Sequence, residues 1–179
     1  MDFKKNLVLR VTDEVLKGRL VARLTARYSY WLGGFFTVEL RSGRAREGFE
    51  LRTPGGRGEL MASKKILSPV SYNKYGISLP ALDGLAADSL IEARKDGKIA
   101  LIDELGPLTL GSEKLALAVF ETLSSGTPCL ATFRRNARTF EDTFTKMADT
   151  RVLDTDASGI QSSMDEWMEY WIKKLFGRK

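Results

Sequence analysis

Two adjacent carboxylates follow an apolar stretch near the middle of the chain. Residues 98–102 read Lys-Ile-Ala-Leu-Ile and predict a buried strand, and Asp103 and Glu104 come directly after it. Paired carboxylates at the end of a buried strand are how a nucleotide hydrolase presents an aspartate that holds magnesium and a base that activates water. This pair is therefore the first candidate for chemistry in the chain.

A segment near the N-terminus has the outline of a phosphate-binding loop but lacks its glycines. Residues 6–20 predict a strand, a short loop and a helix. The pattern G-x-x-x-x-G-K-[ST] needs glycine at positions 11 and 16, lysine at 17 and a hydroxyl at 18. The chain has Val11, Leu16, Lys17 and Gly18 at these positions, so only the lysine is retained.

The substitutions remove the groups with which such a loop binds phosphate. Backbone N–H groups can wrap a phosphate where glycines adopt positive φ and allow close approach, and Val11 and Leu16 resist both. Gly18 replaces the hydroxyl that would ligate magnesium beside Asp103. The sequence thus predicts that the phosphate nest is not formed.

The residues that follow suit a capped helix better than an anion site. Thr12 is the predicted N-cap, and Asp13 and Glu14 place negative charge where a phosphate would lie. We therefore interpret residues 6–27 as a strand and an amphipathic helix, with Lys17 in solvent.

Composition narrows the function classes. The chain has 179 residues, of which 43% are hydrophobic, which suits one α/β domain over residues 1–179. There is no histidine, which excludes Ser-His and Cys-His nucleophiles, so proton transfer must use carboxylates or lysine. A net charge of +5 permits an acidic partner without arguing for one.

The single cysteine and the hydropathy pattern bear on location. Cys129 lies in an apolar segment and is expected to be a buried, unpaired thiol. The sequence has neither a run of 18 apolar residues nor a signal-peptide pattern. We expect a cytoplasmic protein without a membrane partner.

Apolar periodicity predicts alternating strands and helices, and hence a largely parallel sheet with helices on both faces. Strands are expected at 7–11, 98–103, 127–132 and 151–153, and helices at 13–27, 80–94, 138–148 and about 162–176, with a further helix marked by Leu115 and Val119. An antiparallel hairpin is expected at 35–52. Residues 53–78 carry many turn-forming residues and predict irregular surface structure, with a short strand at 58–62.

Three helices carry apolar stripes. The expected members are Val15, Leu16, Leu20 and Leu24 in the first helix, Leu115, Val119, Phe120 and Leu123 after the carboxylates, and Met164, Trp167, Met168, Trp171, Ile172 and Leu175 at the C-terminus. The C-terminal stripe either packs on its own domain, which we favour, or serves a protein partner or a homodimer.

Four segments together resemble the nucleoside-triphosphatase family of thermophile enzymes and their human cancer-related relative. Residues 34–41, G-F-F-T-V-E-L-R, resemble its G-F-Y-T-x-E-V-R strand, and 48–51, G-F-E-L, resemble its G-F-D-L strand. Residues 73–77, N-K-Y-G-I, are similar to G-K-Y-G-V, and 102–110 resemble I-D-E-[IL]-G-P-L-E-L, with Thr109 in place of glutamate. In order and spacing the resemblance covers residues 6 to about 155.

This resemblance implies a P-loop NTPase fold and magnesium-dependent hydrolysis of several nucleoside triphosphates. By position, Asp103 would hold Mg²⁺ through water, Glu104 would polarise the attacking water, and Lys17 would contact the phosphates. The family's G-x-x-G-x-G-K-T-T corresponds to V-T-D-E-V-L-K-G-R, so Gly18 and Arg19 fall at the end of the nucleotide-binding loop.

One basic pair lies near a further family element. Arg134 and Arg135 follow the predicted strand that ends at Thr132, and a basic element of the family falls at this place. Arg134 is a nucleotide-binding candidate that would face a γ-phosphate, and the alternative is a solvated loop pair.

Three functions remain open from the sequence. The first, which we favour, is a degenerate family member with weak or no nucleotide hydrolysis that acts by nucleotide or partner binding, because two glycines and a magnesium hydroxyl are lost together. The second is an active magnesium-dependent NTPase in which Arg19 and Arg134 replace the lost donors. The third is a nucleic-acid-binding module that uses the hairpin-region arginines Arg41, Arg44, Arg46, Arg52 and Arg57.

Overall fold

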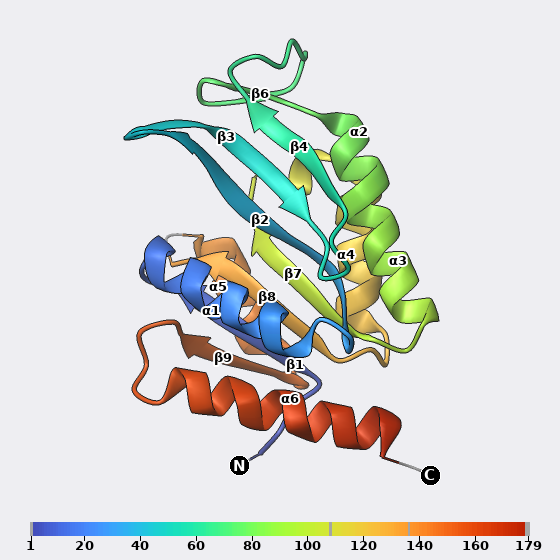
Figure 1. Cartoon of the computed structure of the whole chain (residues 1–179). Helices are drawn as coiled ribbons and strands as arrows, with labels where there is room; N and C mark the ends of the chain where they lie inside the picture. Colours follow the sequence, from blue (N-terminus) through green and yellow to red (C-terminus); the bar gives the residue numbers. More distant parts are fainter. Residues whose placement is uncertain (1, 108, 136, 178–179) are drawn as a thin grey trace.

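One continuous sheet runs through the molecule. The computed structural model describes residues 2–107, 109–135 and 137–177, and within them nine strands are arranged in the order β5-β6-β4-β3-β2-β7-β8-β1-β9 (Figure 1). Five neighbouring strands are parallel: β2 (Leu32–Ser42), β7 (Ile99–Leu105), β8 (Cys129–Arg134), β1 (Asn6–Val11) and β9 (Thr150–Asp154). The predicted parallel sheet is thus confirmed.

The other side of the sheet is antiparallel. Strand β2 continues beyond β7 and pairs with β3 (Ala45–Arg52), which confirms the hairpin expected at 35–52. β3 then pairs with β4 (Gly58–Ser63), β4 with β6 (Tyr75–Ile77), and β6 with β5 (Ser71–Tyr72). The strand expected at 58–62 is therefore present, but residues 53–78 contain more regular structure than their turn residues predicted.

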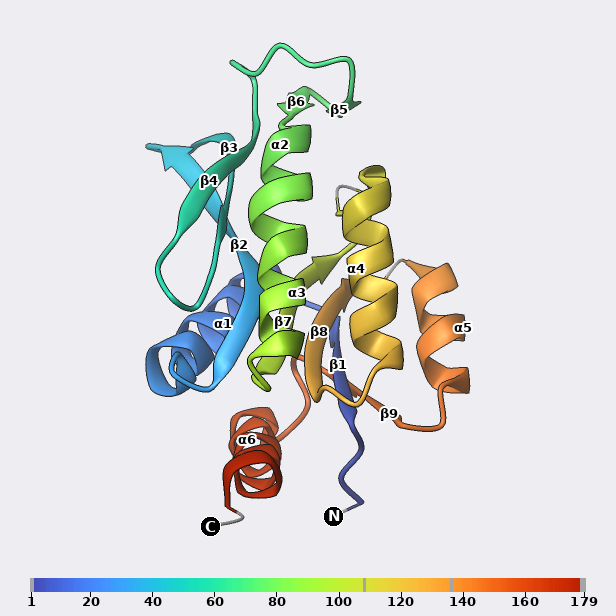
Figure 2. The ribbon, with the colours of Figure 1, turned by 90° about the vertical axis from the view of Figure 1, so that its right-hand side faces the viewer.

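Helices cover both faces of the sheet. On one face lie α1 (Glu14–Tyr28) and α6 (Ile160–Phe176), and on the other lie α3 (Ala87–Lys95), α4 (Glu113–Ser124) and α5 (Arg138–Lys146) (Figure 2). Successive residues of β7 serve the two faces: Ile99 and Leu101 pack toward α1 and α6, and Ala100 and Ile102 pack toward α3 and α4. The two cores explain why this strand is apolar along its whole length.

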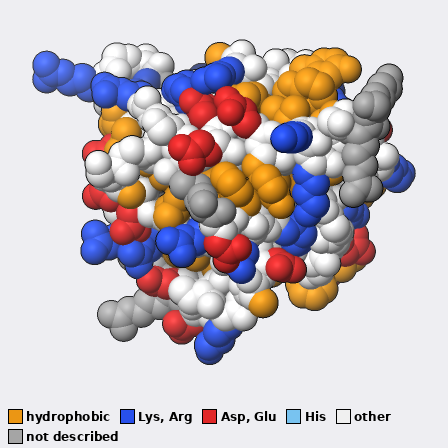
Figure 3. All heavy atoms as spheres, turned by 90° about the horizontal axis from the view of Figure 1, so that it is seen from below, with side chains coloured by type: hydrophobic (Ala, Val, Ile, Leu, Met, Phe, Trp, Pro, Cys, Tyr) orange, Lys and Arg blue, Asp and Glu red, His pale blue; other side chains and the backbone are white. Residues whose placement is uncertain are grey.

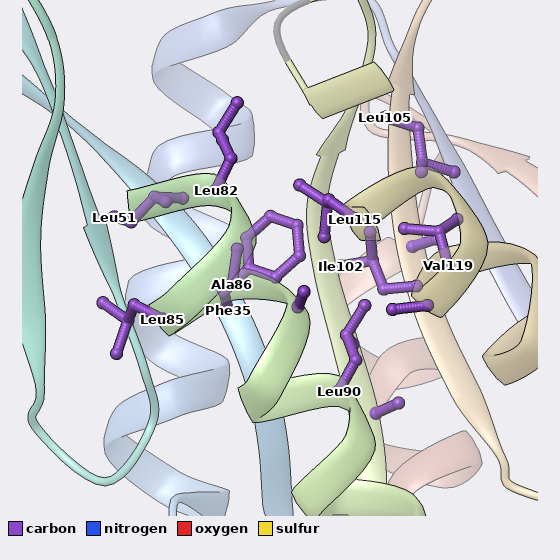
Figure 4. Close-up of a cluster of buried hydrophobic side chains, with 14 of the residues drawn as sticks. Phe35, Leu51, Leu82, Leu85, Ala86, Leu90, Ile102, Leu105, Leu115 and Val119 are labelled. Atoms are coloured by element: carbon purple, nitrogen blue, oxygen red, sulfur yellow. The ribbon is translucent and has the colours of Figure 1, made fainter. Parts of the chain in front are cut away.

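The helix expected at about 80–94 is present as a continuous rod of three parts, α2 (Leu79–Ala81), the π-helical turn η1 (Leu82–Ala86) and α3. Its side chains meet those of β2, β7 and α4 in one buried cluster, in which Phe35, Leu82, Leu90, Ile102 and Leu115 converge (Figure 4). Phe35 and Ile102 are opposite each other where β2 pairs with β7, so this cluster fixes the two strands relative to each other.

The start of α1 differs from the sequence prediction in two ways. Asp13, and not Thr12, is the N-cap: its Oδ1 accepts a hydrogen bond from Leu16 N at 2.7 Å, whereas the Thr12 hydroxyl lies 3.0 Å from that of Thr155. Val15 is 64% exposed and does not belong to the apolar stripe. The buried face of α1 passes through Lys17 instead, together with Leu20, Val21, Leu24 and Tyr28.

One residue of α4 was also assigned to the wrong face. Leu115, Val119 and Leu123 are buried as expected, but Phe120 is exposed. Phe120 follows Val119 by one position, which rotates its side chain by about 100° away from the sheet. The short 3₁₀ turn η2 (Thr109–Gly111) precedes this helix.

The C-terminal helix packs on its own sheet, as we favoured, and begins two residues before the predicted start at 162. Trp167, Met168 and Trp171 are buried, and Trp171 Nε1 donates a hydrogen bond to the Lys4 carbonyl at 3.1 Å. Cys129 is buried and unpaired, as predicted. None of the helices in the described residues has the length and apolar character needed to cross a membrane.

Candidate functional site

Asp103 lies near the carboxyl end of β7 and is 1% exposed. Its Oδ1 accepts a hydrogen bond from Thr132 Oγ1 of β8 at 2.6 Å, and its Oδ2 accepts from Thr37 N and Thr37 Oγ1 of β2 at 3.3 and 3.4 Å. β2 and β8 flank β7 in the sheet, with Phe35 and Ala131 opposite Ile102, so Thr37 and Thr132 can reach the Asp103 carboxylate from both sides. Both oxygens of Asp103 are therefore already engaged by the protein.

Lys17, on α1, is the cation next to the Asp103 carboxylate. Its Nζ lies 3.2 Å from Asp103 Oδ1 and 3.6 Å from both Glu104 Oε2 and Glu14 Oε2. The expectation that Lys17 is in solvent is wrong, because its side chain is only 8% exposed and lies on the face of α1 that packs on the sheet. Burial alone would lower the pKa of Lys17, but the carboxylates of Asp103, Glu104 and Glu14 outweigh it and raise that pKa above its ordinary value.

Glu104 and Arg134 form the outer part of the site. Arg134 Nε donates to Glu104 Oε1 at 2.7 Å and lies 3.3 Å from Glu14 Oε1. Burial raises the pKa of Glu104 above its ordinary value, and Lys17 and Arg134 offset only part of that effect. Strand β8 extends to Arg134, two residues past its predicted end, so this arginine faces the pocket side and is not part of a solvated loop pair.

A small pocket of about 50 Å³ lies between these charges and the antiparallel half of the sheet. Its apolar wall consists of Phe49, Met61, Tyr72 and Pro107. None of these four residues was predicted from the sequence to belong to a site. The alternation that predicted the hairpin placed Phe49 on a strand, but no local pattern shows that β3, β4 and β5 fold back toward β7.

Two of the predicted nucleotide-binding residues lie outside this pocket. Gly18 and Arg19 are both exposed on α1, and neither lines the cavity. Thr109 does line it: its hydroxyl donates to the carbonyls of Glu104 and Gly106 and accepts from Gly106 N, each at 3.0 Å, and so holds the turn after β7. Leu108 of the quoted motif falls outside the described residues.

The segment in the place of the phosphate loop is wound into helix. Only Thr12 and Asp13 separate the end of β1 from the start of α1. The N–H of Leu16 is bonded to the Asp13 carboxylate at 2.7 Å, and the N–H of Lys17 is bonded to the Asp13 carbonyl at 3.0 Å. Backbone donors that a phosphate loop would offer to an anion are here used by the helix itself.

The residues present do not fit a magnesium ion as they are arranged. Both Asp103 oxygens accept hydrogen bonds from threonines and lie next to Lys17, and Gly18 supplies no hydroxyl. Across the described part of the chain, no group of three or more histidine, cysteine or acidic side chains is arranged to hold a metal. Lys17 Nζ, 3.2 Å from Asp103 Oδ1, would compete with a metal ion for this carboxylate.

The hairpin arginines are mostly neutralised by neighbouring carboxylates. Arg41 and Arg46 both pair with Glu39, at 2.9 Å for Arg46, and Arg52 pairs with Glu50 at 3.0 Å. Arg57 pairs with Glu92. Within the residues that the structure describes, Arg44 alone of the five makes no ion pair, so this surface offers little free charge to a nucleic acid.

Comparison with known proteins gives a consistent result. The model of the family described as NTPase matches residues 11–161. A nucleoside-triphosphatase THEP1 of Methanocaldococcus jannaschii is 33% identical over 65% of this chain and 68% of its own, and one of Methanothermobacter thermautotrophicus is 33% identical over 70% of each.

Two solved structures share the fold. The crystal structure of THEP1 from Aquifex aeolicus superposes with a TM-score of 0.77 at 22% identity, covering 89% of this chain and 96% of its own. The solution structure of a human cancer-related nucleoside triphosphatase gives a TM-score of 0.64 at 20% identity, covering 94% and 96%. The fold class predicted from the sequence is confirmed by these likenesses.

Proposed function

The chain belongs to the NTPase family of nucleoside-triphosphatases, and from this premise we propose that it is a degenerate member with weak or no nucleotide hydrolysis that acts through a partner. The observation that carries the proposal is the first turn of α1. Asp13 caps this turn and bonds to Leu16 N and Lys17 N, so the helix occupies the place of a phosphate-binding loop. Several preorganised donors are lost together, and each such donor typically contributes about 2.7–4 kcal/mol to catalysis.

The charges around the pocket support the same proposal. Three carboxylates, those of Glu14, Asp103 and Glu104, face the two cations Lys17 and Arg134, which leaves one formal negative charge. A nucleoside triphosphate would have to compete with these carboxylates for both cations. Removing one partner from a buried ion pair such as Lys17–Asp103 typically costs about 3–5 kcal/mol, so competition for Lys17 is unfavourable.

The size of the pocket is a third argument. Small-molecule sites usually enclose about 300–1,000 Å³, whereas this pocket has about 50 Å³. Nucleotide entry would therefore require Lys17 and Arg134 to leave their carboxylate partners and the apolar wall to move outward.

Calorimetric titration with ATP and with GTP, each with and without MgCl₂, tests the proposal directly. We expect no saturable binding or dissociation constants weaker than about 1 mM, which corresponds to about 4 kcal/mol of binding free energy. Lys17→Met serves as the matched variant. Any heat of nucleotide binding that this variant still shows does not come from the Lys17 site. Tight, magnesium-dependent binding that Lys17→Met abolishes would overturn the proposal.

An active magnesium-dependent NTPase is the second candidate, and one observation favours it. Lys17, Asp103, Glu104 and Arg134 belong to one contact network, as a hydrolytic centre requires. Phosphate release from ATP or GTP separates the two candidates. Robust turnover that is lost in Glu104→Gln supports the active enzyme, and release at the background rate in both proteins supports the degenerate one.

The proposal also covers location. We propose that this protein functions in the cytoplasm. A buried free thiol at Cys129, without a disulfide, agrees with that location.

A further inference from the structure

An exposed aromatic surface lies at the end of the molecule where both termini emerge (Figure 1). Tyr30 and Trp31 follow α1, and Phe176 ends α6. The ring centroids of Tyr30 and Trp31 are 4.7 Å apart, and those of Trp31 and Phe176 are 4.6 Å apart. Tyr30 is 75% exposed and Phe176 is 38% exposed. We call Tyr30, Trp31, Leu175 and Phe176 the terminal aromatic surface.

A hollow of about 240 Å³ adjoins this surface, and Leu175 lines it together with Lys98, Gly97, Gly126, Thr127 and Pro128. The hollow lies next to the aromatic residues, because Leu175 precedes Phe176 and because Ile99, next to Lys98, donates its N–H to the Trp31 carbonyl at 2.9 Å. A Cβ added at Gly126 would meet no atom within 4 Å. The hollow therefore has room for a side chain from another molecule.

Three lysines flank the terminal aromatic surface and its hollow. Lys98 lies before β7, and Lys173 and Lys174 lie in the last turn of α6. Among the described residues none of the three has an ion-pair partner, whereas Arg23 and Arg27 of the neighbouring α1 are both paired with Asp165. Lys173 and Lys174 interact favourably with the negative C-terminal end of the α6 dipole. Lys98 lies outside α6, so the helix dipole does not account for its position. Figure 3, which views this end of the molecule, shows hydrophobic side chains exposed next to basic ones.

We propose that the terminal aromatic surface is a docking site for an acidic segment of a partner protein that carries a large apolar side chain. The apolar side chain would enter the hollow beside Leu175, and carboxylates would pair with Lys98, Lys173 and Lys174. Protein interfaces combine aromatic side chains at the centre with a charged rim, which is the composition found here. This inference goes beyond the degenerate NTPase and does not depend on nucleotide turnover.

The shape of the surface favours a protein over a lipid membrane. Membrane-surface binding requires apolar groups that project from the molecule into the headgroup region. Here Tyr30 projects, but it adjoins a hollow lined by Leu175, and Trp167 and Trp171 of α6 are buried against the sheet. A concave apolar site is complementary to a side chain and not to a bilayer.

A fluorescence-anisotropy titration with defined peptides tests the proposal. The probes are fluorescein-labelled acidic octapeptides with Leu, Phe, Trp or Met at the centre, and the reference probe has serine there. We expect saturable binding that requires the apolar centre. Lys98→Gln combined with Lys173→Gln and Lys174→Gln should weaken binding by at least about fivefold, and Gly126→Leu, which fills the hollow, should also weaken it.

The matched control removes the same charge at the opposite end of the molecule. Lys64, Lys65 and Lys74 are exposed in the segment around β5 and β6, and changing all three to Gln should leave peptide binding unaltered. Equal binding of the serine reference, equal loss in both triple variants, or no binding by any probe would overturn the proposal. Preferential binding to phosphatidylserine vesicles, lost in the first triple variant, would also overturn it and assign the surface to membranes. Phosphate release is recorded in parallel, so failure of this proposal is distinguishable from failure of the proposed function.

Discussion

Lys17 Nζ lies 3.2 Å from Asp103 Oδ1, and both side chains are almost completely removed from solvent. The pair joins the first helix to the strand that carries the two carboxylates. Each charge is paired where a nucleotide hydrolase would need it free, the lysine for phosphate and the aspartate for magnesium. If the proposed function is correct, this contact holds the site closed, and nucleotide binding would have to break it.

Breaking this contact should cost more than its length alone suggests. Lys17→Met preserves most of the side-chain stem but leaves Asp103 buried without a cation, and we expect the free energy of unfolding to fall by about 3–5 kcal/mol. Chemical denaturation followed by circular dichroism measures the change. Lys114→Met, which removes an exposed pair with Asp88, should cost no more than about 1 kcal/mol. Equal losses in the two variants would contradict a stabilising role for the buried pair.

Rebuilding the phosphate loop should raise nucleotide affinity. We expect a gain in ATP binding by calorimetry when Val11, Glu14 and Leu16 are changed to glycine and Gly18 to threonine, because the first turn of α1 then unwinds. The space for threonine is present, since a Cβ at Gly18 meets no atom within 4 Å.

The control for this variant weakens α1 elsewhere. Ala22→Gly with Ala26→Gly costs about 1 kcal/mol per site at exposed helical positions and should give no gain in affinity. A well-folded quadruple variant that binds ATP no better than the original chain would show that the rest of the pocket has closed as well.

Ionisation of Glu104 should lower the free energy of unfolding as the pH rises above the ordinary pKa of a glutamate. Burial raises its pKa in the folded protein, so in the window between the ordinary and the raised value the unfolded chain has lost the proton that the folded chain retains. The folded state then binds more protons, and the free energy of unfolding decreases with pH until the raised value is passed. Below the ordinary value both states are protonated and the contribution is constant.

Denaturation midpoints measured across the acidic range test this prediction. Glu104→Gln should lack this component of the decrease, whereas Glu166→Gln, at an exposed position of α6, should retain it. A wild-type profile that rises throughout the window, unchanged by Glu104→Gln, would refute the assignment.

Because α6 packs on its own sheet, we expect its buried tryptophans to contribute to stability and not to self-association. Trp171 is buried and its Nε1 is hydrogen-bonded to Lys4, so Trp171→Ala should lower the free energy of unfolding by about 3–5 kcal/mol without changing the sedimentation coefficient. Leu117→Ala, at an exposed position of α4, should change stability by less than about 0.5 kcal/mol. Unchanged stability combined with weaker self-association would instead place the tryptophan at a dimer contact.

The sequence was sufficient for most of the fold because its apolar periods are local. The uninterrupted apolar run of β7 indicated a strand buried on both faces, and alternation in β2 and β3 indicated the hairpin. The convergence of Asp103, Glu104 and Arg134 also follows from topology, because parallel strands end at one edge of the sheet. Their roles toward a nucleotide remain predictions.

Other features depend on contacts between distant segments. Thr12 and Asp13 are both good N-caps, and residue type alone could not show that the Thr12 hydroxyl lies next to that of Thr155. Lys17 looked solvated because a lysine on a helix usually is, and its burial depends on two carboxylates about ninety residues away. Tyr72 reaches the pocket only because β5 and β6 fold over it, which no local signal indicates.

The two outermost strands of the sheet bear on how the protein behaves at high concentration. An unpaired strand edge can template the growth of ordered aggregates, and proteins reduce this hazard by keeping such edges short or charged. Here one border is the two-residue β5, and the other, β9, carries Arg151 and Asp154. Polymerisation through strand addition is thereby disfavoured at both borders, so substitutions that lengthen β5 or neutralise β9 are the ones expected to produce fibrous aggregates.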